Sequence, residues 1–430
     1  MFIHESANWP HFTWDKDKIS SLDRKALMHL GYLGGRMAAI GLDNRLKAMV
    51  ETVTNDIVAS SGIEGVNLDT DEVRSSVARK LGVDIPDTKE PTHFIDGIVE
   101  MMLDAIGNHR DPLTEERLFA WHRTLFPTGY SGLSPIRAGQ YRVDEMTVVS
   151  GNFGRERIHY RAPKPDVVEA EMNSFISWLN IHDDSISAIV RAAIAHLWFV
   201  SIHPFDDGNG RMARAISDMV LAELDGDKLH FYSLSRQILK DRKHYYRVLE
   251  STQRGNVDIT EWLEWFIGAH IQAVQDSDAM LSQVLRKATF WNVHAQCSIS
   301  ERQRGVLNIY LDGYDAKLTV KNWARQAGVS VDTASRDIAD LVSKGILTPT
   351  PGRRRDIPYS INYTVADGQP LPFSEITIDE SGKGPFISAI YKNGQTVCDK
   401  LITNDLARYK EHEVSLADLA SKYFAYLLQN

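Results

Sequence analysis

Apolar residues recur at intervals of three and four positions along most of the first 290 residues. The stretch 19–61 keeps this spacing throughout, which is typical of an amphipathic helix or a helix pair. The same period returns in four later segments, at residues 174–180, 186–202, 211–224 and 258–291. The sequence therefore predicts a mainly α-helical protein.

One segment within this helical region follows a different pattern. Polar and apolar residues alternate around 146–149 (MTVV) and 157–161 (RIHYR), and the turn-forming residues SGNFG lie between them. Alternation with a period of two on both sides of a glycine-containing turn indicates a β-hairpin. This hairpin comes shortly before the helices at 174–180 and 186–202.

The pattern changes again from about residue 299. Residues 300–314 predict a helix, and residues 318–350 predict a short helix, a turn at AGVS and a longer helix. Two short strands around a basic tip follow within 345–362. This order is typical of a winged helix-turn-helix. The remaining residues, 367–430, predict a small mixed tail that we leave unassigned.

Length, charge and cysteine content narrow the class of protein. A chain of 430 residues is too long for one typical domain. The net charge of -9 argues against a protein that coats nucleic acids without sequence preference, although a local basic patch stays possible. The only two cysteines, Cys297 and Cys398, are far apart, which fits a reducing compartment better than a disulfide framework. No signal peptide or membrane-spanning run stands out, so we expect a cytoplasmic protein.

Residues 200–214 (VSIHPFDDGNGRMAR) concentrate polar and conformationally permissive residues directly after an apolar helix. Pro204 disfavours a helical backbone at His203, so we expect one helix to end near Ile202 and the next to begin near Gly210. The intervening glycines allow backbone amides to approach an anion closely, and a helix N-terminus offers free N–H groups. Phe205 is expected to point inward and hold the loop to the core.

The side chains around this loop suit phosphate chemistry. Arg211 and Arg214 are three residues apart and share a helical face, so both could contact one phosphate chain. An aspartate in the loop could hold Mg²⁺ between phosphates, and His203 could accept a proton from an attacking hydroxyl. The alternative is a helix N-terminus capped by Asp206 or Asp207, in which His203 is an ordinary loop histidine.

The loop closely resembles the signature of Fic proteins, H-x-F-x-[D/E]-G-N-G-R-x-x-R. All eight specified positions match, at His203, Phe205, Asp207, Gly208, Asn209, Gly210, Arg211 and Arg214. The resemblance implies a Fic-type helical core with a β-hairpin flap. It also implies transfer of AMP from ATP to a Tyr, Thr or Ser hydroxyl of a target protein or of the enzyme itself, with release of pyrophosphate.

The resemblance also implies a role for each residue of the loop. His203 would be the general base and Asp207 the Mg²⁺ ligand. The backbone from Gly208 to Gly210 would cradle phosphates, with Asn209 directing the α-phosphate. Arg211 would neutralise the α- and β-phosphates, and Arg214 would meet the γ-phosphate.

A second resemblance lies upstream, in the sequence SSGIEG at residues 60–65. It is similar to the family's inhibitory motif, [S/T]-x-x-x-E-[G/N], and predicts an inhibitory helix around residues 55–66. Ser60 and Glu64 share a helical face, and Glu64 would pair with Arg214 and keep ATP from binding well. In some family members the same glutamate also serves the removal of AMP. The alternative is an exposed glutamate near a helix end formed by Gly65.

Two further segments resemble parts of the family. The second strand of the hairpin is similar to the flap that borders the nucleotide and holds the target, and its residues are Arg157, Ile158, His159 and Tyr160. Downstream, Tyr245 and Tyr246 match a segment of the family around adenine, and Gln253 stands where the family often has Asn. The alternatives are a surface hairpin and core tyrosines on an amphipathic helix.

The resemblance covers roughly residues 1–290, and long bacterial Fic proteins share its N-terminal segment. We therefore divide the chain into four parts: an N-terminal helical segment (1–95), a catalytic core (96–290), a winged-helix domain (299–366) and the mixed tail (367–430). Homodimers are frequent in this family, and the sequence leaves the oligomeric state open.

Two other functions remain open from the sequence. One is a different phosphate transfer on the same fold, which the intact DGNGR disfavours. The other is a DNA-binding regulator, with Thr333, Ser335 and Arg336 on a recognition helix and Arg353–Arg355 in the wing. Three acids on the same helix would oppose DNA, at Asp332, Asp337 and Asp340.

Overall fold

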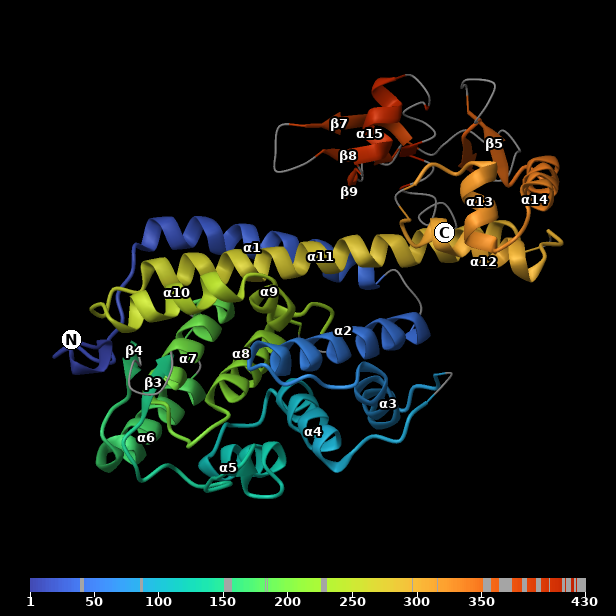
Figure 1. Ribbon diagram of the computed structural model, residues 1–430. Coiled ribbons are helices and arrows are strands. Elements are labelled where there is room, and N and C mark those ends of the chain that lie inside the picture. Colours follow the sequence, from blue (N-terminus) through green and yellow to red (C-terminus); the bar gives the residue numbers. More distant parts are fainter. Residues whose placement is uncertain are drawn as a thin grey trace. The chain divides into compact units, whose positions relative to one another are not determined.

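The computed structural model of the chain is shown in Figure 1. The residues that it describes are 1–38, 42–85, 88–150, 157–181, 183, 185–225, 230–295, 297–314, 316–350, 357–362, 373–380, 385–391, 396–401, 403–411, 414, 419–420 and 423. The chain divides into two compact units, Met1–Ser277 and Asp278–Asn430, and each unit is described by itself.

The first unit is built mainly of helices, as the hydrophobic periodicity predicts. Its helices are η1 (Ile3–Glu5), α1 (Lys16–Ala38), α2 (Leu42–Ile63), α3 (Thr70–Leu81), α4 (His93–Gly107), α5 (Glu115–Leu125), η2 (Pro165–Val167), α6 (Val168–Asn180), α7 (Ala188–Ile202), α8 (Asn209–Asp225), α9 (Leu234–Lys240), α10 (Arg242–Gln253) and the start of α11 (Thr260–Val293). The stretch 19–61 is thus a helix pair. Gly65, with φ of +80°, lies just beyond the end of α2 at Ile63.

Helix α7 forms the centre of this unit. Every residue from Ile189 to Ile202 is buried, so the helix is apolar on all faces rather than on one stripe. Helix α8 packs along it, and α6 packs against another side (Figure 1). Because α7 is enclosed, its C-terminus and the start of α8 have fixed positions. The loop that connects them is therefore fixed at both of its ends.

Two short β-hairpins lie beside these helices. The predicted hairpin is present as β3 (Thr147–Ser150) paired antiparallel with β4 (Arg157–Arg161), with a register shift between Val148 and Val149. A smaller hairpin joins β1 (Tyr130–Ser131) to β2 (Ser134–Pro135). The tip of the larger hairpin, residues 151–156, lies outside the described residues.

The second unit contains the end of α11 and two further groups of elements. In the first group, α12 (Glu301–Leu311), α13 (Val320–Ala327) and α14 (Val331–Ser343) precede the antiparallel pair β5 (Leu347–Pro349) and β6 (Tyr359–Ile361). Trp323, Ile338 and Leu341 are in the core that joins them. The element order is the predicted one, while the winged-helix assignment itself stays a prediction. The basic tip with Arg353–Arg355 lies outside the described residues.

The second group is the mixed tail. Strands β7 (Phe373–Asp379), β8 (Phe386–Tyr391) and β9 (Thr396–Lys400) form an antiparallel sheet in the order β7-β8-β9, and α15 (Thr403–Lys410) follows them. Ile387 and Ala389 of β8 are buried in its small core. Among the helices of both units that the structure describes, none is long and apolar enough to span a bilayer.

Candidate active site

The polar loop connects α7 to α8 through a sharp change of backbone direction. Helix α7 ends at Ile202, and His203 adopts a left-handed conformation with φ of +51° while its N–H still donates to the carbonyl of Phe199. A residue other than glycine seldom adopts this conformation, which costs on the order of 1 kcal/mol or more. Helix α8 then begins at Asn209. The surrounding structure must therefore hold His203 in place.

The His203 imidazole is set up to accept a proton. Its Nδ1 lies 3.2 Å from the carbonyl oxygen of Val200, and because a carbonyl only accepts, Nδ1 carries the hydrogen. The lone pair is then on Nε2. Burial lowers the pKa of His203 to about 4, so the ring is neutral near pH 7. A neutral ring with a free lone pair is the form that a general base requires.

Arg142 holds the backbone at His203 and Pro204 in place through hydrogen bonds. Its Nε donates to the His203 carbonyl oxygen at 2.7 Å, and its own N–H donates to the carbonyl of Pro204 at 2.9 Å. The same guanidinium donates to the carbonyl of Pro163. The sequence analysis missed this residue, because nothing local in the hairpin region marks an arginine whose partners lie some sixty residues away.

Asn209 and Phe205 close the loop on itself. The Asn209 amide nitrogen donates to the Phe205 carbonyl at 2.8 Å, and the amide oxygen accepts the Phe205 N–H at 3.0 Å. The Phe205 ring is fully buried, as the sequence predicts. In this arrangement the Asn209 side chain braces the loop, and its predicted contact with an α-phosphate stays a prediction.

The two loop aspartates make different contacts. Asp206 accepts the Arg137 N–H at 2.9 Å. Asp207 accepts the N–H of Gly208 with one carboxylate oxygen and the hydroxyl of Ser131 with the other. Among the described residues, no group of three or more His, Cys, Asp and Glu side chains could hold a metal. A single carboxylate fits Mg²⁺ when phosphate oxygens of a substrate complete the shell.

Glu64, one residue beyond the end of α2, contacts the buried Arg214 of α8. Arg214 donates from Nη2 to Glu64 Oε1 at 2.8 Å and to the Ser60 carbonyl at 2.9 Å, and from Nε to Ser60 Oγ at 2.8 Å. Burial is the largest single influence on the Arg214 pKa and lowers it, but the Glu64 carboxylate together with Tyr245 and Tyr246 raises that pKa above its usual value. The spacing of Ser60 and Glu64 thus places both groups against one guanidinium.

Gly210 makes room for this carboxylate. A Cβ at position 210 would lie 2.3 Å from Glu64 Oε1, closer than any real contact. The carboxylate therefore lies against the first turn of α8, where the free N–H groups and the helix dipole favour an anion. Glu64 occupies the kind of position that a phosphate would take.

Two guanidinium N–H groups at this turn are buried without a partner among the described residues, Arg211 Nε and Arg214 Nη1. Arg211 also lies over the Phe126 ring, at 4.9 Å from its centroid. A buried donor without an acceptor costs about 1–3 kcal/mol, so both atoms favour an incoming anion. The site therefore fits the phosphates of a nucleotide.

The residues predicted near adenine separate into buried and exposed groups. Tyr245 is 2% exposed and its hydroxyl contacts His196 Nε2 at 3.0 Å, while Gln253 is buried and donates to Ser201 Oγ at 3.1 Å. Both side chains are in the interior in this arrangement, and their predicted contacts with adenine stay predictions. Tyr246 is 39% exposed, and its hydroxyl donates to Glu64 Oε2 at 3.4 Å, while the buried Tyr245 contributes from the core to the raised pKa of Arg214.

The predicted flap residues also differ in burial, from the exposed Arg157 and Ile158 to the buried Tyr160. Tyr160 is buried and donates to the Ser201 carbonyl at 2.7 Å, so it anchors β4 to α7. Ile158 and Arg157 face outward, and His159 is half-buried. The outward-facing residues are those that could meet a nucleotide or a target.

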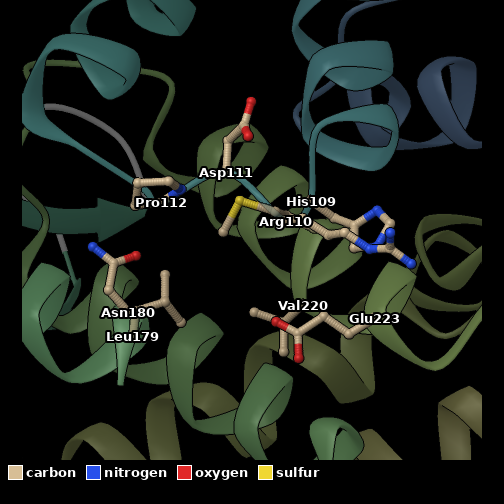
Figure 2. Close-up of a pocket in the computed structure, with 9 residues that line it drawn as sticks. His109, Arg110, Asp111, Pro112, Leu179, Asn180, Val220 and Glu223 are labelled. Carbon is tan, nitrogen blue, oxygen red and sulfur yellow. The ribbon is translucent and has the colours of Figure 1, made fainter. Parts of the chain in front are cut away.

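A separate pocket of about 430 Å³ lies elsewhere in the first unit. Figure 2 shows Val220 and Glu223 of α8 opposite Asp111 of the α4–α5 connection. These α8 residues follow Asn209 by more than ten positions, which is roughly 15 Å along a helix. None of the predicted site residues lines this pocket.

Fold and site together define an α-helical protein in which one helix N-terminus gathers a neutral histidine, an aspartate and two arginines. Comparison with known families is consistent with this class. Residues 112–221 match the Fic/DOC family, and residues 2–83 match a domain of unknown function, DUF4172. Residues 112–221, which include the polar loop, are therefore similar to the Fic/DOC family.

Curated relatives share the matched region at low identity. The chain is 27% identical over 245 residues to Protein adenylyltransferase Fic of Culex quinquefasciatus, covering 56% of this chain and 45% of the relative. It is 25% identical over 245 residues to the protein of the same name in Nematostella vectensis, covering 56% and 53%. The chain thus spans about half the length of these relatives.

Solved structures of Fic proteins are also similar. A Fic family protein from Desulfovibrio desulfuricans G20 aligns with a TM-score of 0.46 and 20% identity, covering 83% of this chain and 98% of that one. Fic-1 from C. elegans aligns with a TM-score of 0.43 and 22% identity, covering 62% and 74%.

Proposed function

We propose that the protein is an adenylyltransferase that moves AMP from ATP to a hydroxyl group of a protein, and that Glu64 inhibits it. The observation that carries this proposal is the Glu64 carboxylate on Arg214, at the N-terminal turn of α8 and in the same loop–helix unit as the neutral His203. The names of the curated relatives support the same activity.

The proposed reaction uses the groups of the loop in a simple order. The target hydroxyl gives its proton to Nε2 of His203 as its oxygen bonds to the α-phosphorus. The bond from that phosphorus to the bridging oxygen breaks, and pyrophosphate leaves. Arg211 and Arg214 stabilise the charge on the phosphates. Mg²⁺ held by Asp207 would add charge neutralisation between phosphates.

Inhibition follows from competition for one guanidinium. While Glu64 holds Arg214, the γ-phosphate of ATP lacks this partner and meets a like charge at the start of α8. The same carboxylate beside the phosphates could orient a water molecule, which would support removal of AMP from a modified target. Both consequences belong to this proposal.

The test compares the wild-type protein with Glu64→Gly. Each is incubated with cell lysate and with ATP labelled at either the α- or the γ-phosphate. We expect Glu64→Gly to transfer the α-label to protein at least about tenfold faster than the wild type. The substitution frees Arg214 for the γ-phosphate, and a charged hydrogen bond of this kind is worth about 1.4 kcal/mol or more. His203→Ala in the same background should abolish the transfer, because the hydroxyl then has no base.

Glu90→Gly is the matched control, since Glu90 is an exposed glutamate whose partner is Arg79. It should behave as the wild type does. Transfer of only the γ-label would show a kinase-type reaction instead. No transfer by Glu64→Gly, or equal transfer by all variants, would contradict the proposal. Loss of label when wild-type protein is added to the labelled product would show AMP removal.

A further inference from the structure

His122, in the last turn of α5, is a buried side chain that contacts the loop between α7 and α8. Its ring is 0% exposed, Nδ1 lies 2.9 Å from the Gly139 backbone nitrogen, and Nε2 lies 3.0 Å from the Asp207 carbonyl oxygen. The Gly139 N–H must donate, so Nδ1 accepts, and the hydrogen of the ring is on Nε2. Both nitrogens are therefore used, and Nε2–H donates to Asp207.

The same ring also supports the loop through stacking. It lies nearly parallel to the Phe205 ring, with the centroids 4.1 Å apart and an angle of 11° between the planes. His122 thus contacts the loop at two residues, through the Phe205 side chain and through the Asp207 backbone. Gly139, with φ of +72°, allows the backbone N–H to approach His122 Nδ1. A Cβ at this position would clash with the Arg123 side chain.

The contact at Asp207 acts on a single peptide unit. In a trans peptide the C=O and the following N–H point in opposite directions, so a fixed Asp207 carbonyl also fixes the Gly208 N–H. Gly208 itself has φ of +81°, and a Cβ there would lie 2.8 Å from the Phe126 ring. Because the Gly208 N–H donates to Asp207 Oδ1, the orientation of this peptide also bears on where the Asp207 carboxylate lies.

We propose that His122 is a positioning residue: by donating from Nε2 to the Asp207 carbonyl, it sets the Asp207–Gly208 peptide in the orientation that receives the nucleotide. The consequence for nucleotide binding rests on the proposed function. The consequence for the loop itself does not, because it depends only on contacts within the chain.

Two amide variants separate the two hydrogen bonds of this ring. The side-chain nitrogen of Gln reaches the place of Nε2, so His122→Gln keeps a donor for Asp207 and loses the acceptor for Gly139. The oxygen of Asn matches the place of Nδ1, so His122→Asn keeps the acceptor and loses the donor. Each variant removes one buried hydrogen bond, so a merely structural role predicts similar effects from both.

The first measurement is amide hydrogen exchange of residues 205–210 in the full chain without nucleotide. We expect exchange in His122→Asn to be about tenfold faster than in wild type, which corresponds to the loss of one buried hydrogen bond. Exchange in His122→Gln should remain within about threefold of wild type. Equal exchange in the two variants, or faster exchange in His122→Gln, would overturn the proposal.

The second measurement is the affinity for ATP with Mg²⁺ in the Glu64→Gly background. His122→Asn should weaken binding by about tenfold and His122→Gln by no more than about threefold. If the background protein with His122 intact binds no ATP, the proposed function has failed, and the exchange measurement still decides the role of His122. If both variants bind ATP equally well, the positioning role is wrong.

Discussion

Arg214 is a buried charged residue that is stabilised by partners from a distant part of the sequence. Its side chain is only 1% exposed, so its charge needs compensation within the protein. Glu64 and Ser60 provide it from a helix some 150 positions earlier in the chain. The carboxylate contributes the charge, while the serine hydroxyl and carbonyl fix the direction of the guanidinium.

Ser60 therefore offers a graded test of inhibition at the scale of one residue. Ser60→Ala removes the bond to Arg214 Nε but leaves Glu64 in place. We expect the rate of AMP transfer to rise by a few-fold, which corresponds to about 0.5–1 kcal/mol, the net value of an ordinary intramolecular hydrogen bond. The rise should be smaller than that in Glu64→Gly, measured with labelled ATP.

Ser61→Ala is the control for this substitution. Ser61 is equally buried, and its hydroxyl has no hydrogen-bond partner among the described residues. Its replacement should leave the transfer rate unchanged. If Ser61→Ala activates the protein as strongly as Ser60→Ala does, the effect comes from loosening α2 and not from freeing Arg214.

At the scale of elements, α10 fastens the flap strand β4 to the helical body. Glu250 accepts from Arg157 at 2.8 Å and contacts His159 Nδ1 at 2.6 Å. One turn later, Arg254 donates to the carbonyls of Ile158 and His159. Burial opposes the charge on Glu250, but the bonds to His159 and Arg157 outweigh burial and lower the carboxyl pKa. The strand is thus held by charges that no spacing in the sequence marks.

Glu250→Gln keeps the size of this side chain and removes its charge. We expect faster amide exchange in residues 157–161 and slower AMP transfer to a protein target, by about three- to tenfold, since charged hydrogen bonds exceed neutral ones. The affinity for ATP should not change, because the proposed phosphate site is at the start of α8. Amide hydrogen exchange of residues 157–161 is measured first. The rate of AMP transfer is then measured while the concentration of the target protein and that of ATP are varied separately.

Glu264→Gln is the matched control, because Glu264 pairs with Lys18 on α1 and not with the flap. It should leave both exchange and transfer unchanged. Weaker ATP binding in Glu250→Gln, with the target affinity unaffected, would contradict the role given to this contact.

At the scale of the whole first unit, buried histidines link stability to pH. Burial lowers the pKa values of His196 and His270 to about 3, and those of His122 and His203 to about 4. The unfolded chain binds these protons near pH 6.5, and the folded chain does so only far below it. The unfolded state therefore gains protons first as the pH falls, and stability is lost from about pH 6.5 downward.

His270 is the most suitable residue for testing this link. Its ring is fully buried, and neither nitrogen has a hydrogen-bond partner among the described residues. We expect His270→Gln to reduce the loss in the free energy of unfolding between pH 7 and pH 5 by about 2 kcal/mol. Urea denaturation followed by tryptophan fluorescence measures this difference. An identical loss in wild type and variant would show that His270 does not titrate in this range.

The sequence by itself determined the features that depend on near neighbours. Pro204 after His203 predicted the end of α7, and the glycines predicted the loop before α8. The four-residue spacing of Ser60 and Glu64 placed them on one face, since a helix brings such positions together. The alternating residues predicted the β3–β4 hairpin. These are consequences of local backbone geometry, and a sequence shows them directly.

Only the tertiary structure decided which side chains meet across the chain. It placed Tyr160, Tyr245 and Gln253 in the interior, and it brought Arg142 and His122 to the active-site loop. The last two contacts join residues 61 and 85 positions apart. Hydrogen bonds of this kind depend on how whole helices pack, and helix packing follows from the shape of the complete core rather than from any local pattern.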